Sequence, residues 1–229
     1  MKHAMGIPMS GKDIISKMNY DYYIIASDQD LDGWNINGLL LVFFDKFPEL
    51  FTQKRILRLQ TPIARIKYKN LTIKNAGDSI EFFTTEELEN WLKNNKVPSN
   101  MEIKYYKGLG SNDTQYASMF AKNIKKYLYT FFPNPGYKED LARYYDKENP
   151  DLRKQELSTP VGKLSPTAQK YFDAKLIPIS TFLRVYVKQY QLYNLGRKLL
   201  NVMRGQNRVT NKIIHSLDKI FTSKEMSVK

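Results

Sequence analysis

The stretch YYIIASDQDLDG, residues 22–33, decides the fold of this chain. Its first half, Tyr22 to Ser27, is an apolar run rich in aromatic and β-branched residues, which is typical of a buried strand. The run ends in a cluster of aspartates within Ser27 to Gly33, here called the acidic loop. Apolar residues then occupy nearly every position from Asn35 to Phe47, which predicts a helix packed deeply against a sheet and ended by Pro48. A strand, an acidic loop and a helix are therefore expected in direct succession.

Strand and helix patterns continue to alternate after this first unit. Residues 55–68 alternate apolar and polar positions around Thr61-Pro62, which predicts two strands with a break between them. Thr84 with Glu87 three residues later forms a capping box, which predicts a helix start. The other expected elements are a hairpin with strands at 71–74 and 79–83, the helix from 84 to 95, a strand at 101–106 and a helix at 112–127. This order predicts an α/β fold with a mostly parallel sheet flanked by helices.

The composition changes after PNPG at residues 133–136. Helical patterns follow at 151–157 and 180–203, and a basic helical tail continues to about Phe221. Between them lies a linker rich in Ser, Thr, Pro and Gly, from Thr159 to Pro166. A helical, basic C-terminal region is therefore expected. The predicted parts are an N-terminal segment at 1–20, an α/β domain at 21–132, a helical linker region at 133–165 and a further helical region at 166–229.

The charge of the chain favours a polyanionic partner. The 229 residues include 36 Lys and Arg against 23 Asp and Glu, which gives a net charge of +13 and a pI near 9.6. A pI this high is typical of nucleic-acid-binding domains. A basic protein without such a partner, or one that rests on anionic lipid, stays open on charge alone.

Other classes are excluded by what the sequence lacks. There is no cysteine, which excludes disulfides and thiolate metal sites, and the two histidines, His3 and His215, are too far apart to suggest zinc. No apolar run is long enough for a membrane span, and the first 21 residues lack the apolar middle of a signal peptide. We expect a soluble protein of the cytoplasm.

The acidic loop predicts a metal site. Asp28, Asp30 and Asp32 stand at alternate positions, so an extended backbone would place their carboxylates on one side, where they repel unless a cation is bound. Carboxylate oxygens without His or Cys select magnesium, manganese or calcium. The calcium loop of an EF-hand requires glutamate at its twelfth position, which is Leu39 here. A solvated acidic turn remains the simpler alternative.

At this point the sequence resembles the Toprim domain of type II DNA topoisomerases. The strand and acidic loop are followed by WNINGLLLVFF at residues 34–44, and further motifs come in the same order: TPI at 61–63, YYKGLGS at 105–111 and DLRK at 151–154. The resemblance implies that residues 21–132 are the C-terminal half of a Toprim module. A weaker resemblance relates residues 166–229 to the start of the breakage-reunion region with its winged helix, although Arg204 replaces the usual Asp of that region.

The organisation is similar to that of the medium subunit of the T-even bacteriophage topoisomerase. In this family the metal site also needs a glutamate from an upstream EGDS motif, and this chain has none before Asp28. The resemblance therefore implies a partner ATPase subunit that uses ATP and contributes the glutamate. The nucleophilic tyrosine of the family lies further along, so it is expected on another subunit. Ala142-Arg143-Tyr144 imitates its local motif in the wrong place and is interpreted as coincidence.

The resemblance also assigns roles in the site. Asp28 would be shared between two metal positions, Asp30 would bind the second metal, and Asp32 would bind or orient it through water. Mg²⁺ is the expected cofactor, and Mn²⁺ or Ca²⁺ could substitute in binding. Gly33 lets the chain turn into the helix without a Cβ clash.

Contacts with DNA are expected from glycines and basic residues. The loop from Lys107 to Gly110 has the form of one that brings backbone amides close to a phosphate, although an ordinary strand-to-helix turn has the same form. The residues expected to touch the DNA backbone include Lys104, Lys107, Gly108, Gly110, Lys122, Lys125, Lys126, Arg197, Lys198, Arg204 and Arg208.

These features together predict a subunit of an ATP-dependent type II DNA topoisomerase, which cleaves and religates double-stranded DNA. The chain alone is expected to be inactive, and if it is encoded by a phage it belongs in the host cytoplasm. The alternative is a non-catalytic DNA-binding or regulatory fragment of a divided topoisomerase gene. A third possibility, another Toprim protein such as a primase or nuclease, is disfavoured by the TPI and YYKGLGS motifs.

Overall fold

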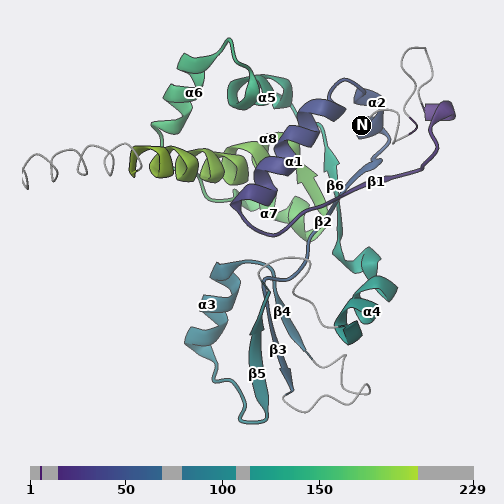
Figure 1. Ribbon diagram of the computed structural model, residues 1–229, viewed down its shortest axis with the longest axis vertical. Helices are drawn as coiled ribbons and strands as arrows, with labels where there is room; N and C mark the ends of the chain where they lie inside the picture. Colours follow the sequence, from purple (N-terminus) through teal and green to yellow (C-terminus); the bar gives the residue numbers. More distant parts are fainter. Residues whose placement is uncertain (1–5, 7–14, 69–78, 107–113, 201–229) are drawn as a thin grey trace, which may run out of the picture. The chain divides into compact units, whose positions relative to one another are not determined.

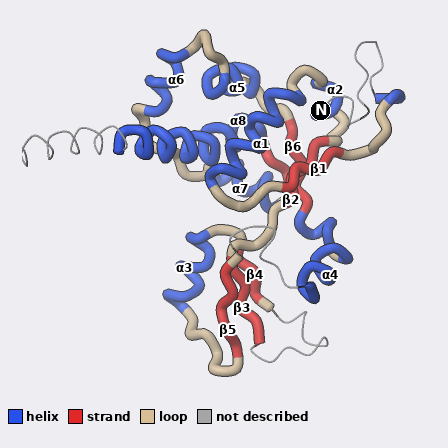
Figure 2. The backbone as a smooth tube through the Cα atoms, viewed as in Figure 1, coloured by secondary structure: helices blue, strands red, loops and turns tan. Residues whose placement is uncertain are grey.

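The structure is a computed structural model that describes residues 6, 15–68, 79–106 and 114–200 (Figure 1). The chain divides into two compact units, residues 1–188 and residues 189–229. The strands belong to the first unit and form two sheets, which Figure 2 shows as separate groups. Among the described helices, none is both long enough and apolar enough to cross a lipid bilayer.

The larger sheet has four strands in the order β1-β2-β6-β7. β1 (Tyr23–Ala26) runs parallel to β2 (Ile56–Leu59), and β7 (Leu176–Pro178) runs parallel to β6 (Leu128–Phe132), whereas β2 and β6 are antiparallel. The predicted α/β fold, with a parallel-containing sheet flanked by helices, is confirmed. β6 and β7 were not predicted from sequence, because β6 is a nearly continuous apolar run after a helix and β7 is only three residues long and contains proline.

Helices cover this sheet and enclose the main core. Tyr23 of β1 packs on Phe44 with 5.7 Å between ring centroids, and Phe131 of β6 packs on Phe182 at 5.2 Å. The helices that contribute to this core are α1 (Leu31–Phe44), α2 (Pro48–Thr52), α5 (Tyr137–Tyr145), α8 (Ile179–Phe182) and the π-helix η5 (Leu183–Val187).

The smaller sheet is antiparallel, in the order β4-β3-β5, and comprises β3 (Ala64–Tyr68), β4 (Ile80–Phe82) and β5 (Met101–Tyr105). Helix α3 (Thr85–Asn94) packs Leu88 and Trp91 against it. The predicted capping box is confirmed, since the Thr84 hydroxyl accepts from the Glu87 N–H at 3.1 Å and the Glu87 carboxylate accepts from the Thr84 N–H at 3.3 Å. The predicted break at Thr61-Pro62 also exists, and it separates β2 from β3.

Two other expectations differ from the structure in extent. The helix expected at 112–127 comprises α4 (Thr114–Lys122) and the 3-10 helix η4 (Ile124–Tyr127). The region expected to be helical after residue 166 contains the strand β7, which pairs with β6 of the larger sheet. Residues 166–188 therefore belong to the first compact unit, and the second unit begins at Gln189. Residues 189–200 of the second unit are helical, and 71–78 of the expected hairpin lie outside the described residues. The remaining elements are η1 (Ile15–Lys17), α6 (Pro150–Leu157) and α7 (Pro166–Asp173).

Candidate functional site

The acidic loop leaves the carboxyl end of β1 and enters α1. Asp28 is half-buried, whereas Asp30 and Asp32 are exposed. Asp30 has an extended backbone, with φ −125° and ψ 179°, and its Oδ1 accepts a hydrogen bond from the Gly33 N–H at 2.8 Å. Asp30 is therefore the N-cap of α1, a position that favours aspartate.

This early helix start corrects one expectation about the loop. The helix was expected from Asn35, but α1 begins at Leu31, so Asp32 lies in its first turn. The extended backbone therefore stops at Asp30, and the expectation that all three aspartates alternate along one extended segment is wrong for Asp32. Its role as a metal ligand stays a prediction.

The donor set of the loop fits part of a site for a hard cation. Asp28 and Asp30 offer only carboxylate oxygens, which magnesium and calcium prefer, and the cap hydrogen bond engages only one oxygen of Asp30. Within the described part of the chain, no three His, Cys, Asp or Glu side chains form a group that could hold a metal ion. Magnesium is commonly held by one or two carboxylates together with waters and substrate phosphates, so Asp28 and Asp30 could supply the protein ligands of such a site.

Gly33 allows the loop to approach the start of α1 closely. A Cβ built on Gly33 would lie only 2.0 Å from the carbonyl oxygen of Asp28. Any side chain at this position would displace that backbone, and with it the residue predicted to bind metal. The prediction that glycine avoids a Cβ clash here is confirmed.

A buried polar cluster beneath the loop was missed from sequence. Asn37 of α1 is fully buried, and its amide donates to the hydroxyl of Ser27 and to the carbonyl of Gly33, both at 2.7 Å. The Ser27 hydroxyl in turn donates to the Gly33 carbonyl at 3.2 Å. These bonds join the end of β1 to the first turns of α1. A usable signal existed, because Asn37 is a polar residue inside an otherwise apolar helix.

A buried arginine also reaches the loop. Arg58 of β2 is 2% exposed, and its Nη2 donates to Oε1 of Gln29 at 2.7 Å. Its guanidinium carbon lies 5.4 Å from the ring centroid of Phe182 and 6.0 Å from that of Tyr186. Burial lowers the pKa of Arg58 to about 10, while Tyr186 and then Tyr129 act to raise it. The sequence held no signal for this burial, because the alternation in RILRLQ is equally typical of an arginine that faces solvent.

Five of the eleven residues predicted to contact DNA are not placed. Lys107, Gly108, Gly110, Arg204 and Arg208 lie outside the described residues. Lys104, on β5, is half-buried and pairs in register with Arg65 of β3, and its Nζ lies 5.6 Å from the ring centroid of Tyr106. Of the other basic residues, Lys126 pairs with Glu81 at 2.8 Å.

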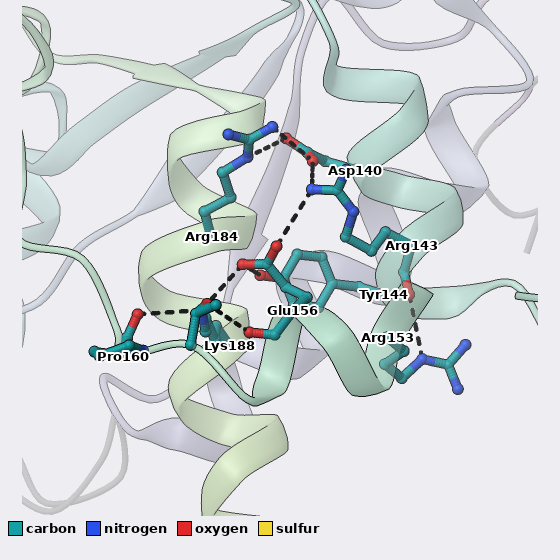
Figure 3. A network of polar contacts seen from close by, with 9 residues as sticks. Asp140, Arg143, Tyr144, Arg153, Glu156, Pro160, Arg184 and Lys188 are labelled. Carbon is teal, nitrogen blue, oxygen red and sulfur yellow. Dashed lines mark hydrogen bonds and ion pairs between the residues drawn. The ribbon is translucent and has the colours of Figure 1, made fainter. Parts of the chain in front are cut away.

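A second group of charged residues, the helical cluster, joins α5 and α6 to η5 and its extension (Figure 3). Its members are Asp140, Arg143, Tyr144, Glu156, Arg184 and Lys188. Asp140 is fully buried and lies between Arg143 at 2.9 Å and Arg184 at 2.8 Å. Glu156 binds the ammonium of Lys188 at 3.0 Å. Each carboxylate in this cluster therefore has a cation from the chain itself.

The helical cluster also explains two stretches singled out from the sequence. Arg153 of the DLRK motif donates to the carbonyls of Arg143 and Asp146, which ties α6 to the end of α5. Tyr144 is 1% exposed and donates to Glu156 at 3.2 Å. Burial, then the charge and hydrogen bond of Glu156, hold the pKa of Tyr144 well above its usual value. A phenol in this position is structural and is unsuited to attack DNA.

Two topoisomerase relatives align with most or all of the chain. The chain is 35% identical to DNA topoisomerase 2 of African swine fever virus (isolate Pig/Kenya/KEN-50/1950) over 211 residues, which is 91% of this chain and 17% of that protein. It is 28% identical to DNA topoisomerase 2 of Saccharomyces cerevisiae over 234 residues, 100% of this chain and 16% of that protein. The chain thus spans about a sixth of the length of these relatives.

A solved structure has the same fold. The crystal structure of the Plasmodium falciparum topoisomerase II DNA-binding, cleavage and re-ligation domain superposes with a TM-score of 0.71 and 26% identity, over 85% of this chain and 26% of that one. The family described as the C-terminal associated domain of TOPRIM matches residues 59–195, more than half of the chain. The protein therefore belongs to that family, the Toprim-associated region of type II DNA topoisomerases.

Proposed function

We propose that this chain is a subunit of an ATP-dependent type II DNA topoisomerase and supplies the Mg²⁺-binding acidic loop of its DNA cleavage site. The observation that carries the proposal is the placement of Asp28 just after β1, whose Tyr23 and Ile25 are buried, and of Asp30 at the start of α1. The similarity to topoisomerases over most of the chain supports it. Since the chain spans 17% of the viral relative, the whole activity would need further polypeptide.

The chain's own residues would hold and orient the reacting groups. Asp28 and Asp30 would bind the cation, and Asp32 would bind it or orient it through water. When bound, Mg²⁺, or Mn²⁺ or Ca²⁺ in its place, would stabilise negative charge on the DNA phosphate and the leaving 3′ oxygen. The attacking tyrosine would come from a partner chain. Gly33 would keep the loop against α1, and Asn37 would fix the end of β1.

The position of β1 at the edge of the described sheet supports the proposed ATPase partner. β1 pairs with β2 on one side, and no described strand pairs with it on the other. A strand at a sheet edge can be joined by a strand from another chain. A strand added there would bring the missing glutamate to the acidic loop. We infer that the subunit that uses ATP contributes this glutamate.

Double-stranded DNA is the proposed substrate. The net charge of +13 supports binding to its phosphates, and affinity should fall steeply as salt rises. Lys104, Lys107, Gly108, Gly110, Arg204 and Arg208 remain the proposed contacts. The predicted division into a Toprim half-module at 21–132, a linker region and the start of a breakage-reunion region at 166–229 also remains a proposal.

One observation favours a second candidate, a non-catalytic DNA-binding or regulatory fragment. Within the described residues the acidic loop does not form a group of three potential metal ligands, and Asp30 already serves as a helix cap. In that case the aspartates would be structural, and DNA binding would not depend on a divalent cation. The two candidates differ in what happens when one carboxylate is neutralised.

The test replaces Asp28 with Asn in the chain co-expressed with the polypeptides that carry the ATPase and the tyrosine. A pull-down establishes the complex, and covalent DNA cleavage is measured in Mg²⁺. Cleavage should fall on the order of a hundredfold or more, because charge stabilisation at the phosphate is lost. Asp21→Asn is the matched control, since Asp21 has an exposed side chain before β1. Equal cleavage by Asp28→Asn and wild type would defeat the catalytic assignment and favour the second candidate.

A further inference from the structure

Gln29 stands in the acidic loop between the two residues proposed to bind metal. Its side chain reaches back to β2, where Nε2 donates to the Leu59 carbonyl at 3.1 Å and Oε1 accepts from Arg58 at 2.7 Å. The same Nε2 lies 3.3 Å from the Ser27 carbonyl at the start of the loop. Gln29 therefore fastens the loop to the neighbouring strand by its side chain.

Arg58 is held in an unusual environment for a cation. Its side chain is 2% exposed and forms no ion pair with the described residues. Among those residues, Gln29 is the hydrogen-bond partner of its guanidinium, and Nε has none. Phe182 and Tyr186 provide ring faces near the guanidinium, an arrangement that stabilises a desolvated arginine. A buried charge with so few partners is costly, so the contact with Gln29 has few substitutes.

The neutral character of Gln29 matters for the carboxylates beside it. Arginine binds carboxylates strongly, often through two hydrogen bonds. Had Arg58 met Asp28 or Asp30 directly, it would occupy oxygens that a metal ion needs. Binding the amide of Gln29 gives the arginine a partner without that competition.

We propose that Arg58 is a positioning residue that acts through Gln29 to hold the acidic loop in the shape that presents Asp28 and Asp30 to a divalent cation. The presentation to a cation rests on the proposed function. That Gln29 fastens the loop to β2 does not rest on the proposed function, because it follows from the hydrogen bonds of Gln29. Arg58 is too buried to touch DNA itself.

The first measurement is amide hydrogen exchange of the full chain without metal. Gln29→Met removes the hydrogen bonds and keeps the buried cation, Arg58→Met removes the guanidinium, and the double variant combines them. Exchange at residues 28–33 should become roughly tenfold faster in Arg58→Met, the effect of losing one hydrogen bond to a charged group. The increase should be at least as large in Gln29→Met, which also loses the hydrogen bonds to Leu59 and Ser27. The double variant should add little to Gln29→Met, because Gln29→Met already removes the hydrogen bond through which Arg58 reaches the loop. Exchange in β6 reports whether the fold is intact.

Wild-type exchange rates at residues 28–33 in Gln29→Met would overturn the proposal. That variant decides the matter even if Arg58→Met fails to fold, because Gln29 is only half-buried. The double variant could also overturn the proposal. If the effects of the two single variants on exchange added fully, Arg58 and Gln29 would act on the loop separately.

The second measurement is the affinity of the same chains for Mn²⁺, followed by electron paramagnetic resonance, with Asp28→Asn as control. Gln29→Met leaves Arg58 without its partner and should lower Tm, so Mn²⁺ affinity is compared at a temperature where both chains are folded. There the variant should bind Mn²⁺ roughly tenfold more weakly than wild type, which a merely structural role would not produce. If Arg58→Met bound Mn²⁺ more tightly and Gln29→Met bound it normally, Arg58 would act only as a repelling charge and positioning would be refuted. If Asp28→Asn bound Mn²⁺ like wild type, the proposed metal site would fail, while the exchange experiment would still decide the hold on the loop.

Discussion

Aspartate and arginine lie near each other in both the acidic loop and the helical cluster. They pair directly in the helical cluster, whereas in the acidic loop the arginine pairs with a neutral side chain. In the helical cluster, fully buried Asp140 binds Arg143 and Arg184 directly. In the acidic loop, buried Arg58 binds the neutral Gln29, while exposed Asp30 accepts a backbone hydrogen bond from Gly33.

The difference follows from where the carboxylates lie. A carboxylate taken out of water must bring a cation with it, because an unpaired buried charge costs several kcal/mol. A carboxylate at the surface has no such requirement, and it keeps oxygens for a cation from solution. The helical cluster therefore joins helices, whereas the acidic loop is the proposed cation site.

The largest expected effect is the loss of stability when the helical cluster is disrupted. Asp140→Ala should lower the free energy of unfolding by about 3 kcal/mol, because Arg143 and Arg184 lose their common partner and a buried position is emptied. Urea unfolding followed by circular dichroism measures the change. A loss smaller than about 1 kcal/mol would mean that buried Asp140 contributes no more to stability than a surface carboxylate, and the contrast between the two regions would fail.

The second prediction concerns pH and Glu156. Burial alone would raise its pKa, but the hydrogen bond and charge of Lys188, the hydrogen bond of Tyr144 and the charge of Arg143 outweigh it, so the pKa is lowered. A lowered folded-state pKa gives stability that is present above the unfolded-state value and is lost as pH falls through the folded-state value. Unfolding free energy should therefore decline below about pH 4.5.

Glu156→Gln removes this titration and isolates its contribution. At neutral pH the variant should be less stable by about 1 to 2 kcal/mol, the difference between a charged and a neutral hydrogen-bond partner. Its stability relative to wild type should improve as pH falls, which urea titrations at several pH values would show. Parallel pH curves for the two proteins would mean that Glu156 is not coupled to Lys188 as the structure indicates.

The third prediction separates the two tasks of Asp30. Asp30→Ala should lower stability by about 1 kcal/mol through loss of the N-cap, whereas Asp30→Asn should keep the cap and stay near wild type. Both variants remove the charge, so both should lose Mn²⁺ affinity. Thermal unfolding and Mn²⁺ titration of the pair are the measurements. If only Asp30→Ala lost Mn²⁺ affinity, the loss would belong to the cap and the carboxylate would have no role in binding.

The smallest effect is expected at an exposed pair of the DLRK motif. Asp151 and Lys154 approach to 3.4 Å, but their side chains are 91% and 80% exposed. Asp151→Asn should change the unfolding free energy by no more than about 0.5 kcal/mol, because water screens such pairs. This variant is also the surface control for Asp140→Ala. A loss as large as that of Asp140→Ala would show that burial does not separate the two classes of carboxylate.

Local patterns predicted the early part of the chain well. The run at 22–27, the break at Thr61-Pro62 and the Thr84 capping box each depend on interactions within a few residues, and each exists in the structure. β7 could not be predicted in the same way, because a three-residue strand that ends in proline exists only where β6 offers a neighbour. The apolar pattern places the start of α1 too late, because the polar residue that caps the helix, Asp30, also has the pattern of a metal ligand.

The sequence by itself determined the order strand, acidic loop and helix, the charge of the chain and the candidate ligands Asp28, Asp30 and Asp32, since these depend on residue type and spacing. Only the tertiary structure decided that Arg58 is buried beneath the loop and that Asp140 and Glu156 take their cations from η5 and the residue after it. The physical reason is that burial and charge pairing depend on which distant segments pack together. The pattern of RILRLQ is the same whether its arginine meets water or the rings of Phe182 and Tyr186.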